Sequence, residues 1–253
     1  MRLLLLLPIA LAAADKCSVI PSDLWCSNRE LEKTCGFSEH CNRYRSATRN
    51  QPVQLTLFME AFCPGCQAFI IDTLAPMVLN FKEYLNVELV PYGNAHRANG
   101  TIVCQHGEGE CLANKYESCL INFLKPQMQF PFIACVEYGM AKRIQDFQTA
   151  LKECYQRISV PKRVAESVES CVKGDLGIQL QNQAADRTNN AWPEKHQWVP
   201  WFMVNNVSLT KFQVHDKDLS LLICEWYTGD RPIPYCSSIQ KKKLKTMTRR
   251  YWY

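Results

Sequence analysis

The sequence predicts a mixed α/β fold that is rich in disulfides, and three observations support this class. First, a run with alternating apolar residues at 53–57 leads into Cys63-Pro64-Gly65-Cys66, and a helical pattern follows it. Second, the stretch from about 120 to 190 repeats its apolar residues at helical spacing. Third, the chain of 253 residues holds 14 cysteines. In an exported chain, such a high and even number indicates a disulfide framework.

The helix predicted behind the Cys-x-x-Cys motif carries its apolar residues on one face. These residues recur at helical spacing: Ile70, Leu74, Met77 and Phe81. We expect Pro76 to kink this helix, because proline lacks a main-chain donor and its ring clashes with the preceding turn. A Cys-x-x-Cys motif at a strand-to-helix junction is the redox arrangement of thioredoxin-like proteins. The motif therefore predicts a thioredoxin-like fold.

The two cysteines of the motif have different predicted roles. Cys63 falls at the N-terminus of the helix, where unpaired N–H groups and the helix dipole favour a thiolate, and it is the predicted nucleophile. Cys66 lies one turn further in and is the predicted resolving thiol, which attacks a mixed disulfide formed on Cys63. This chemistry needs no metal or organic cofactor, but an external thiol must reduce the pair again.

Two other interpretations of the motif stay open, namely a structural disulfide and half of a zinc site. Zinc would need a second pair of Cys or His residues at ligand spacing. The best available set is Cys104 and His106 with Cys111, and it forms no recognisable finger. We therefore predict no metal site.

The N-terminus has the pattern of a secretory signal peptide. Arg2 precedes a leucine-rich run and small residues end at Ala14, so we expect residues 1–14 to be removed. No later stretch has the ~18 to 20 apolar residues of a membrane span. The sequons at Asn99 and Asn206 are predicted glycosylation sites, which agrees with export.

The formal net charge of +5 is modest, and much of it lies in the basic tail at 237–253. No basic face interleaved with aromatic residues occurs elsewhere, so we expect no nucleic-acid partner. The tail is predicted to be solvated or trimmed.

A short cysteine-rich segment at 15–50 precedes the motif. Its cysteines are Cys17, Cys26, Cys35 and Cys41. Their spacing resembles that of a saposin A-type segment. The alternative is a propeptide or cap that disulfides hold together, because four cysteines in a short exported segment are most simply explained by stabilising disulfides. The polar residues at 43–51 predict a linker and a processing site.

Further elements complete the predicted thioredoxin-like sheet. Residues 86–90 form a predicted strand that ends at a turn at 91–94. Strand, helix and second strand, joined by a right-handed crossover, make the opening unit of such a sheet. We expect a helical insertion at about 96–195 within a domain that spans 51–236. A last helix is expected at 219–226.

The segment at 198–204 is a predicted strand with Pro200 at its start. By resemblance to thioredoxin-like folds, the Val199–Pro200 bond should be cis, and this loop should face the motif and bind the substrate backbone. A trans proline that starts an edge strand is the alternative. The two asparagines at 205–206 tolerate positive φ and predict a hairpin into 207–209.

One stretch carries a specific family resemblance. The run from Cys104 to Cys119 has the form Cys-Gln-His-Gly-Glu-x-Glu-Cys-x-x-Asn-x-x-x-x-Cys. A Tyr-Gly-Asn-Ala turn begins at Tyr92, and a Trp-Val-Pro-Trp segment begins at Trp198. In these features the chain resembles the gamma-interferon-inducible lysosomal thiol reductase family over roughly residues 52–236.

The resemblance implies a thiol reductase that acts on disulfide-bonded protein substrates in endosomes and lysosomes, with a glycan-dependent lysosomal sorting receptor as a further partner. An ordinary thiol with a pKa of ~8.5 is almost fully protonated near pH 5, so Cys63 would need a strongly lowered pKa. Two other functions remain open. One is a disulfide oxidase or isomerase of the secretory pathway, and the other is a non-catalytic secreted binding protein in which Cys63 and Cys66 are structural.

The other residues of the family run have structural interpretations. His106 is predicted to be a hydrogen-bonding scaffold residue, and Glu108 and Glu110 to be first-turn acids that stabilise a helix start. The cysteines predicted to form structural disulfides, with no pairing assigned, are Cys104, Cys111, Cys119, Cys135, Cys154, Cys171, Cys224 and Cys236.

Overall fold

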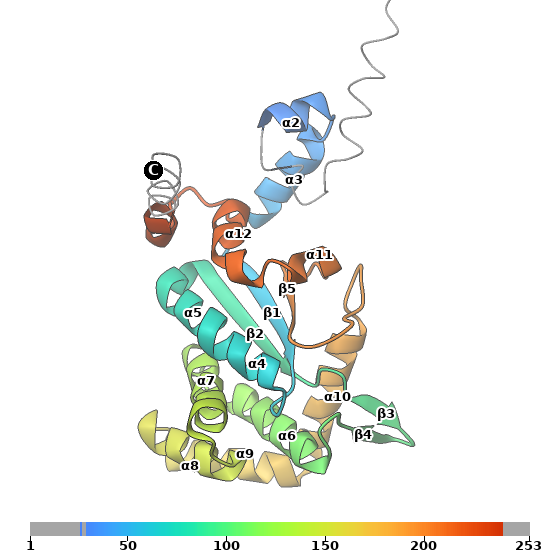
Figure 1. Ribbon diagram of the computed structural model, residues 1–253, viewed down its shortest axis with the longest axis vertical. Helices are drawn as coiled ribbons and strands as arrows, with labels where there is room; N and C mark the ends of the chain where they lie inside the picture. The colour runs from blue at the N-terminus through green and yellow to red at the C-terminus, as the bar shows by residue number, and fades with distance from the viewer. Residues whose placement is uncertain (1–25, 27–28, 240–253) are drawn as a thin grey trace, which may run out of the picture.

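A computed structural model describes residue 26 and residues 29–239, and its centre is a three-stranded sheet (Figure 1). The strand order is β2-β1-β5, with β1 (Val53–Met59) parallel to β2 (Leu85–Pro91) and antiparallel to β5 (Trp201–Val204). The parallel strand–helix–strand unit confirms the α/β class. The predicted signal peptide at 1–14 and most of the predicted tail at 237–253 lie outside the described residues.

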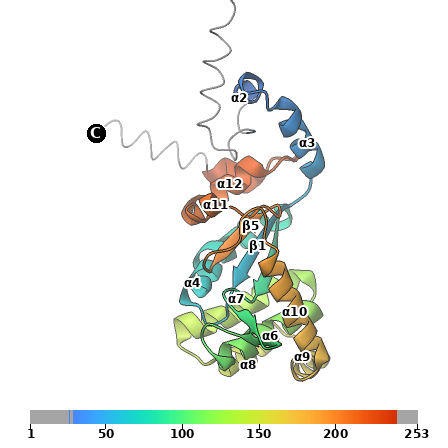
Figure 2. The ribbon, with the colours of Figure 1, turned by 90° about the vertical axis from the view of Figure 1, so that its right-hand side faces the viewer.

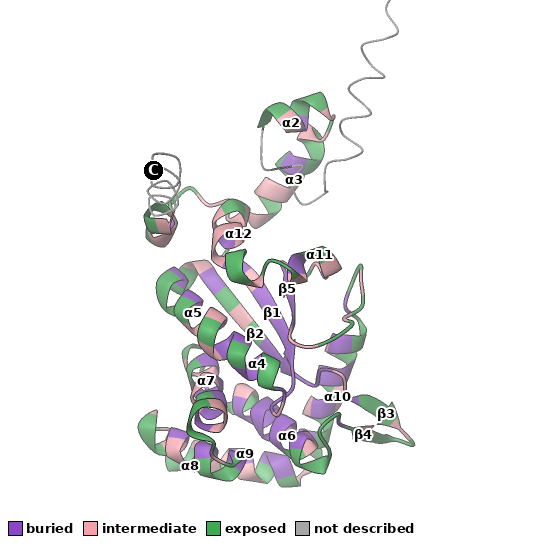
Figure 3. Cartoon of the chain, viewed as in Figure 1, coloured by how far each residue is buried: buried purple, intermediate pink, exposed green. Residues whose placement is uncertain are grey.

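Alternation along the strands divides the interior into two cores. Leu57 of β1 and its partner Phe202 of β5 face the helices that follow the motif, whereas Phe58 and its partner Trp201 face the opposite core. This follows from the period of two in a strand, which sends successive side chains to opposite faces. Figure 3 shows β1 and β5 buried along their length. The turned view places α4 and α10 on opposite sides of the sheet (Figure 2).

The helix behind the motif is continuous but changes its pitch. It consists of α4 (Pro64–Ala68), a π-helical segment η2 (Phe69–Leu74) and α5 (Ala75–Phe81), followed by the short 3₁₀ turn η3 (Lys82–Tyr84). Pro76 lies in the first turn of α5, where a missing N–H is tolerated. The wider π turn leaves room for the proline ring, so the helix changes pitch at the place where we expected a kink.

The insertion between β2 and β5 is helical over most of its length, but it opens with a hairpin. Residues 96–103 form β3 and β4, an antiparallel pair with a tight turn, so the prediction of helix from about 96 was wrong at this end. Two disulfides tie the helices together, Cys119–Cys171 and Cys135–Cys154. The elements are β3 (His96–Ala98), β4 (Thr101–Val103), α6 (Glu108–Phe123), α7 (Pro126–Arg143), α8 (Phe147–Arg157), α9 (Lys162–Lys173) and α10 (Asp175–Asn189).

The chain after β5 turns back at Asn205 and Asn206, which both have positive φ as predicted. The predicted second strand is wrong, because only an isolated bridge between Val204 and Val207 forms there. The last elements are α11 (Thr210–Gln213), the 3₁₀ turn η4 (Asp216–Asp218) and α12 (Leu219–Trp226), and a disulfide joins Cys224 to Cys236.

The N-terminal segment is helical and packs against the C-terminal part of the chain (Figure 1). It contains α2 (Arg29–Thr34) and α3 (Ser38–Thr48), and a disulfide joins Cys26 to Cys41. The linker predicted at 43–51 was therefore wrong, because α3 runs to Thr48. Within the part of the chain that the structure describes, no helix is both long and apolar enough to cross a membrane.

Contacts between this N-terminal segment and distant residues form what we call the clasp. The Tyr44 hydroxyl donates to the main-chain oxygen of Trp226 and accepts from the amide of Asn205. Arg49 pairs with Asp230 at 2.9 Å. The clasp joins segments about 160 to 180 residues apart, a pairing that local sequence patterns do not encode.

Candidate active site

The Cys-x-x-Cys motif lies where β1 ends and α4 begins. Cys63 is the N-cap of α4, with extended backbone angles, and its sulfur accepts a hydrogen bond from the main-chain N–H of Cys66 at 3.4 Å. Both cysteines are free thiols, and both are buried. The motif follows the C-terminal end of β1, the central strand, and Pro64 starts the helix because an N–H is not needed there.

The two thiols have opposite proton affinities. The hydrogen bond from the Cys66 thiol lowers the pKa of Cys63 to about 6; the main-chain N–H groups of Cys66 and Gly65 and the charge of His106 act in the same direction, while burial opposes them. Burial raises the pKa of the Cys66 thiol, and the nearby Cys63 raises it further. One sulfur is thus an available thiolate while the other keeps its proton.

The loop at Val199 and Pro200 lies against the motif. The Val199–Pro200 peptide bond is cis, and the Val199 main-chain oxygen is 3.9 Å from the Cys63 sulfur. A Cβ atom on Gly65 would lie 3.3 Å from the Pro200 ring, so glycine permits this close approach. The Cys63 sulfur therefore faces a main-chain oxygen of this loop.

Helix α6 supports the active-site turn from below. Asn114, which is fully buried, accepts a hydrogen bond from the Ala61 main-chain N–H at 2.9 Å. The amide of Gln67 donates to the Ala61 oxygen at 2.9 Å. Both main-chain groups of Ala61 are therefore fixed by side chains, which holds the turn before Cys63 in place.

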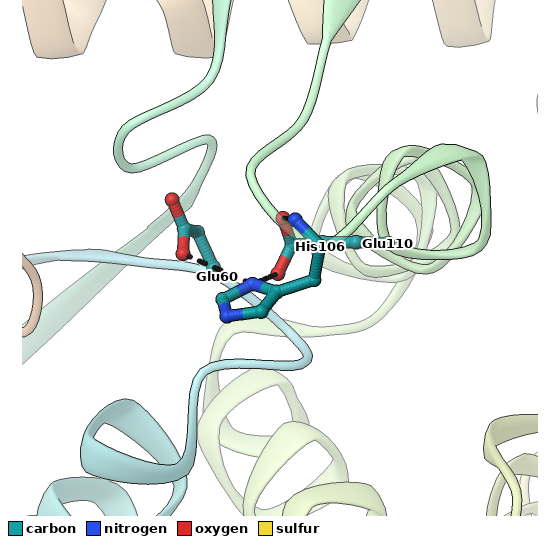
Figure 4. Close-up of side chains that lie close together, drawn as sticks. All are labelled: Glu60, His106 and Glu110. Atoms are coloured by element: carbon teal, nitrogen blue, oxygen red, sulfur yellow. Dashed lines mark hydrogen bonds and ion pairs between the residues drawn. The ribbon is translucent and has the colours of Figure 1, made fainter.

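A cluster of three ionisable side chains lies beside the motif (Figure 4). His106 Nδ1 is 2.5 Å from an oxygen of Glu110 and 3.5 Å from an oxygen of Glu60. The ligand atoms of the three lie within 4.8 Å of one another, which is close enough for a metal ion. The 2.5 Å contact is a hydrogen bond between the imidazole and a carboxylate, and we call the three residues the carboxylate–imidazole cluster.

A second acidic group lies beneath the motif and is completely buried. Glu117 of α6 and Glu137 of α7 are both fully buried, and none of their carboxylate oxygens has a hydrogen-bond partner in the described part of the chain. Burial raises the pKa of Glu117 to about 7 and also raises that of Glu137, which the charge of Glu117 raises further. The raised pKa values keep both carboxyl groups protonated in acid.

The structure also places the remaining predicted residues. The eight cysteines predicted to be structural form four disulfides, of which Cys104–Cys111 ties the loop before α6 to the first turn of that helix. Asn99 is exposed at the tip of the β3–β4 hairpin, and Asn206 is exposed at the turn after β5. Glu108 is exposed in the first turn of α6, whereas Glu110 is buried.

Sequence reasoning missed two residues of the site. Glu60 was not predicted, and its signal was a lone charged residue in an otherwise uncharged run from 53 to 62. Asn114 stood inside the family run without an assigned role. His106 is the hydrogen-bonded residue that we predicted, and its imidazole also lies 3.5 Å from a carboxylate oxygen of the active-site turn.

An ionisable N-cap thiol, a protonated second thiol and an adjacent cis-proline loop on this sheet define a thiol–disulfide oxidoreductase of thioredoxin-like fold. The sequence model described as gamma interferon inducible lysosomal thiol reductase matches residues 54–158. A gamma-interferon-inducible lysosomal thiol reductase of Carassius auratus is 35% identical, over 90% of this chain and 88% of its own length. The Mus musculus protein of that name is 33% identical, over 96% and 94%.

This chain belongs to the gamma-interferon-inducible lysosomal thiol reductase family, and it is a disulfide reductase. A further relative, a gamma-interferon-responsive lysosomal thiol protein of Arabidopsis thaliana, is 31% identical over 81% of this chain and 84% of its own length. The crystal structure of oxidised BdbD from Bacillus subtilis has a TM-score of 0.51 at 18% identity. It covers 70% of this chain and 89% of BdbD, which supports the fold.

Proposed function

We propose that this protein reduces disulfide bonds of protein substrates in an acidic endosomal or lysosomal compartment, with Cys63 as nucleophile and Cys66 as resolving thiol. The observation that carries the proposal is the geometry at the start of α4. There the Cys63 sulfur accepts the Cys66 main-chain N–H at 3.4 Å, while the Cys66 thiol is fully buried.

The reaction takes two exchange steps. The Cys63 thiolate attacks one sulfur of the substrate disulfide, the second substrate sulfur leaves, and a mixed disulfide forms. Cys66 then loses its proton and attacks the Cys63 sulfur, so the substrate leaves reduced and a Cys63–Cys66 disulfide remains. An external thiol reduces this disulfide and completes the cycle.

The Val199–Pro200 loop is the proposed binding site for the substrate backbone. The Val199 oxygen lies beside the Cys63 sulfur and accepts no other main-chain bond among those that the structure gives for the described residues. An extended peptide that places its cysteine at Cys63 meets this oxygen with its own N–H. Main-chain recognition of this kind accepts many sequences, which suits a reductase of varied proteins.

The lowered pKa of Cys63 makes work in acid feasible. With a pKa of about 6, roughly a tenth of Cys63 is thiolate at pH 5. An ordinary thiol with a pKa of ~8.5 would be ionised in about 3 of 10,000 molecules. Lysosomal relatives and the exposed sequons at Asn99 and Asn206 support the compartment and glycan-dependent sorting.

The proposal is tested by trapping the intermediate. In Cys66→Ser, the mixed disulfide with a disulfide-bonded peptide should accumulate on a non-reducing gel at pH 5, and Cys63→Ser should give none. In the reduced wild type, iodoacetamide alkylation of Cys63 should fall as the pH drops through about 6. A single titration at pH 8 to 9, or no adduct in folded Cys66→Ser, contradicts the proposal.

A further inference from the structure

The two exchange steps do not say which group accepts the proton of Cys66. Its side chain is completely buried, burial raises its pKa, and it must give up a proton before it can attack. Water does not reach this sulfur in the described structure. A neighbouring base is therefore needed to take the proton within the fold.

Glu60 is an ionisable residue whose charge and main chain both act on Cys66. It follows β1, is fully buried, and its main chain hydrogen-bonds the Cys66 thiol. One carboxylate oxygen accepts the Asn94 main-chain N–H at 2.6 Å, whereas Oε2 has no hydrogen-bond partner. A buried carboxylate oxygen without a hydrogen-bond partner costs folding stability, so its presence needs an explanation. A role in proton transfer provides one.

The other two members of the carboxylate–imidazole cluster connect Glu60 to the surface. His106 Nδ1 lies 3.5 Å from the free Oε2 of Glu60. Glu110 holds the imidazole by two bonds, one to the ring at 2.5 Å and one to the His106 main-chain N–H at 3.0 Å. The His106 side chain is 35% exposed, while both carboxylates are fully buried. The imidazole therefore leads from the interior to solvent.

The local packing keeps Glu60 in this position. Gly93 has positive φ, and a Cβ atom there would lie 2.5 Å from the Glu60 side chain. Glycine is therefore favoured at position 93 for two reasons: it adopts the positive φ, and it leaves space for the Glu60 side chain. The groups that face Glu60 are Glu110, Cys63 and His106, together with Cys66.

We propose that Glu60 accepts the Cys66 proton during the resolving step and that His106, held in place by Glu110, passes this proton to solvent. This inference rests on the proposed two-cysteine function. The carboxylate of Glu60 takes the proton as the Cys66 sulfur bonds to the Cys63 sulfur. The bond between Cys63 and the substrate sulfur breaks, its electron pair leaves with the substrate as a thiolate, and solvent protonates that thiolate.

The order of events follows from the charges around Glu60. Burial, together with the negative charges of Glu110 and Cys63, raises the pKa of Glu60 to about 7, although the Asn94 N–H and His106 oppose this rise. In the mixed disulfide, Cys63 carries no charge, so one of the causes that keep Glu60 protonated is gone. The loss of this charge lowers the pKa of Glu60, which favours the base form that the resolving step needs.

A quenched single-turnover experiment tests the inference. Reduced protein is mixed with a disulfide-bonded peptide between pH 4.5 and 8, and formation and decay of the mixed disulfide are followed on non-reducing gels. In the wild type, decay should speed up with pH and level off once Glu60 is ionised. In Glu60→Gln, decay at pH 5 to 7 should be about a hundredfold slower without a plateau, while formation at pH 5 stays within about twofold.

Matched variants separate proton transfer from structure. Glu108→Gln changes an exposed acid two residues from His106 in the same way and should leave both rates unchanged. His106→Gln, at a partly exposed site, should slow decay and remove the plateau, and it serves if Glu60→Gln fails to fold. His96→Gln on the exposed hairpin is its control.

Four results would overturn the inference or its basis. A retained plateau in folded Glu60→Gln excludes Glu60 as the base. Equal slowing of formation and decay shows a structural role. A decay that changes with EDTA or added Zn²⁺ in the wild type but not in His106→Gln identifies a metal site instead. Absence of any adduct in Cys66→Ser removes the proposed function itself.

Discussion

The two ends of the sheet use polar side chains in opposite ways. At the active-site end, the carboxylates and amides are fully buried, including Glu60, Asn114 and Glu117. At the clasp end, Arg49 and Asp230 pair with more than half of each side chain exposed. Burial of a polar group is expensive unless its partners are in place, whereas an exposed ion pair contributes little. The comparison teaches that buried polar groups at the active site cost folding stability. The clasp joins the N-terminal segment to residues 205–230 and adds only modestly to the free energy of unfolding.

The largest expected difference between the two ends concerns activity. Cys63→Ser should reduce disulfide reduction to the background rate, because a serine hydroxyl supplies no thiolate, and Tm should hardly change. The measurement is insulin-type disulfide reduction at pH 5 together with thermal unfolding. Substantial activity in the folded variant would show that another residue is the nucleophile, and the expected difference in activity between the two ends of the sheet would then be absent.

The next effect is on stability and its dependence on pH. Burial raises the pKa of Glu117 in the folded protein to about 7, above the ordinary value of a glutamate. Its contribution is therefore fully present below the unfolded pKa and is lost as pH rises through about 7. The free energy of unfolding should fall between pH 5 and 8, by on the order of 3 kcal/mol from this group.

Chemical denaturation of the oxidised protein measures this change, because Cys63 and Cys66 do not titrate as a disulfide. Glu117→Gln should remove the share of the fall that comes from this group, since the amide keeps the shape without the charge; Glu60 and Glu137, whose pKa values are also raised, should keep their own shares. The exposed Glu166→Gln on α9 is the control and should leave the pH dependence as it is. An unfolding free energy that stays level from pH 5 to 8 in the wild type would show that the buried acids ionise without penalty.

A smaller loss is expected at the support of the active-site turn. Asn114→Ala leaves the buried Ala61 N–H without its acceptor, which should lower the free energy of unfolding by about 2 kcal/mol. Asn80→Ala, which removes an exposed amide bonded to the Pro76 oxygen, is the matched control and should change little. Equal effects of the two substitutions would show that burial does not distinguish them.

Local patterns in the sequence predicted the sheet, the motif and the last helix. Alternation at β1 and β2 and the helical stripe behind Cys63 are properties of neighbouring residues. The predictions that failed depend on other parts of the chain. The linker expected at 43–51 is helical as far as Thr48, and Tyr44 in this helix finds its partners about 160 to 180 residues away. The hairpin at 96–103 lacks a long alternating pattern.

The same division holds for the site. Cys63 and Cys66 were located by their spacing, and the loop at Val199 was placed against them through the resemblance to thioredoxin-like folds. The carboxylate–imidazole cluster was not predicted as a unit, because Glu60 and His106 come from different elements. The sequence offered one clue, a charged residue, Glu60, inside an apolar run. That His106 lies beside it becomes visible only in the folded structure.

The smallest effect is expected at the clasp, where Tyr44→Phe tests how firmly the N-terminal segment is held. The change removes a hydroxyl that donates to the Trp226 oxygen at 3.3 Å and accepts from Asn205 at 3.2 Å. Long hydrogen bonds at a partly buried site contribute modestly, so the free energy of unfolding should fall by about 1 kcal/mol. Alkylation of Cys63 should be unchanged, because the clasp lies at the other end of the sheet.

Tyr138→Phe on α7 is the matched control for this prediction, because its ring is partly exposed and it lies outside the clasp. It should leave unfolding as in the wild type. If Tyr44→Phe instead changes the alkylation rate or its pH midpoint, the two ends are coupled through β1, since Asn205 also accepts the Gln54 main-chain N–H. Independent behaviour is expected because β1 and β5, which connect the two ends, are buried over almost all of their length.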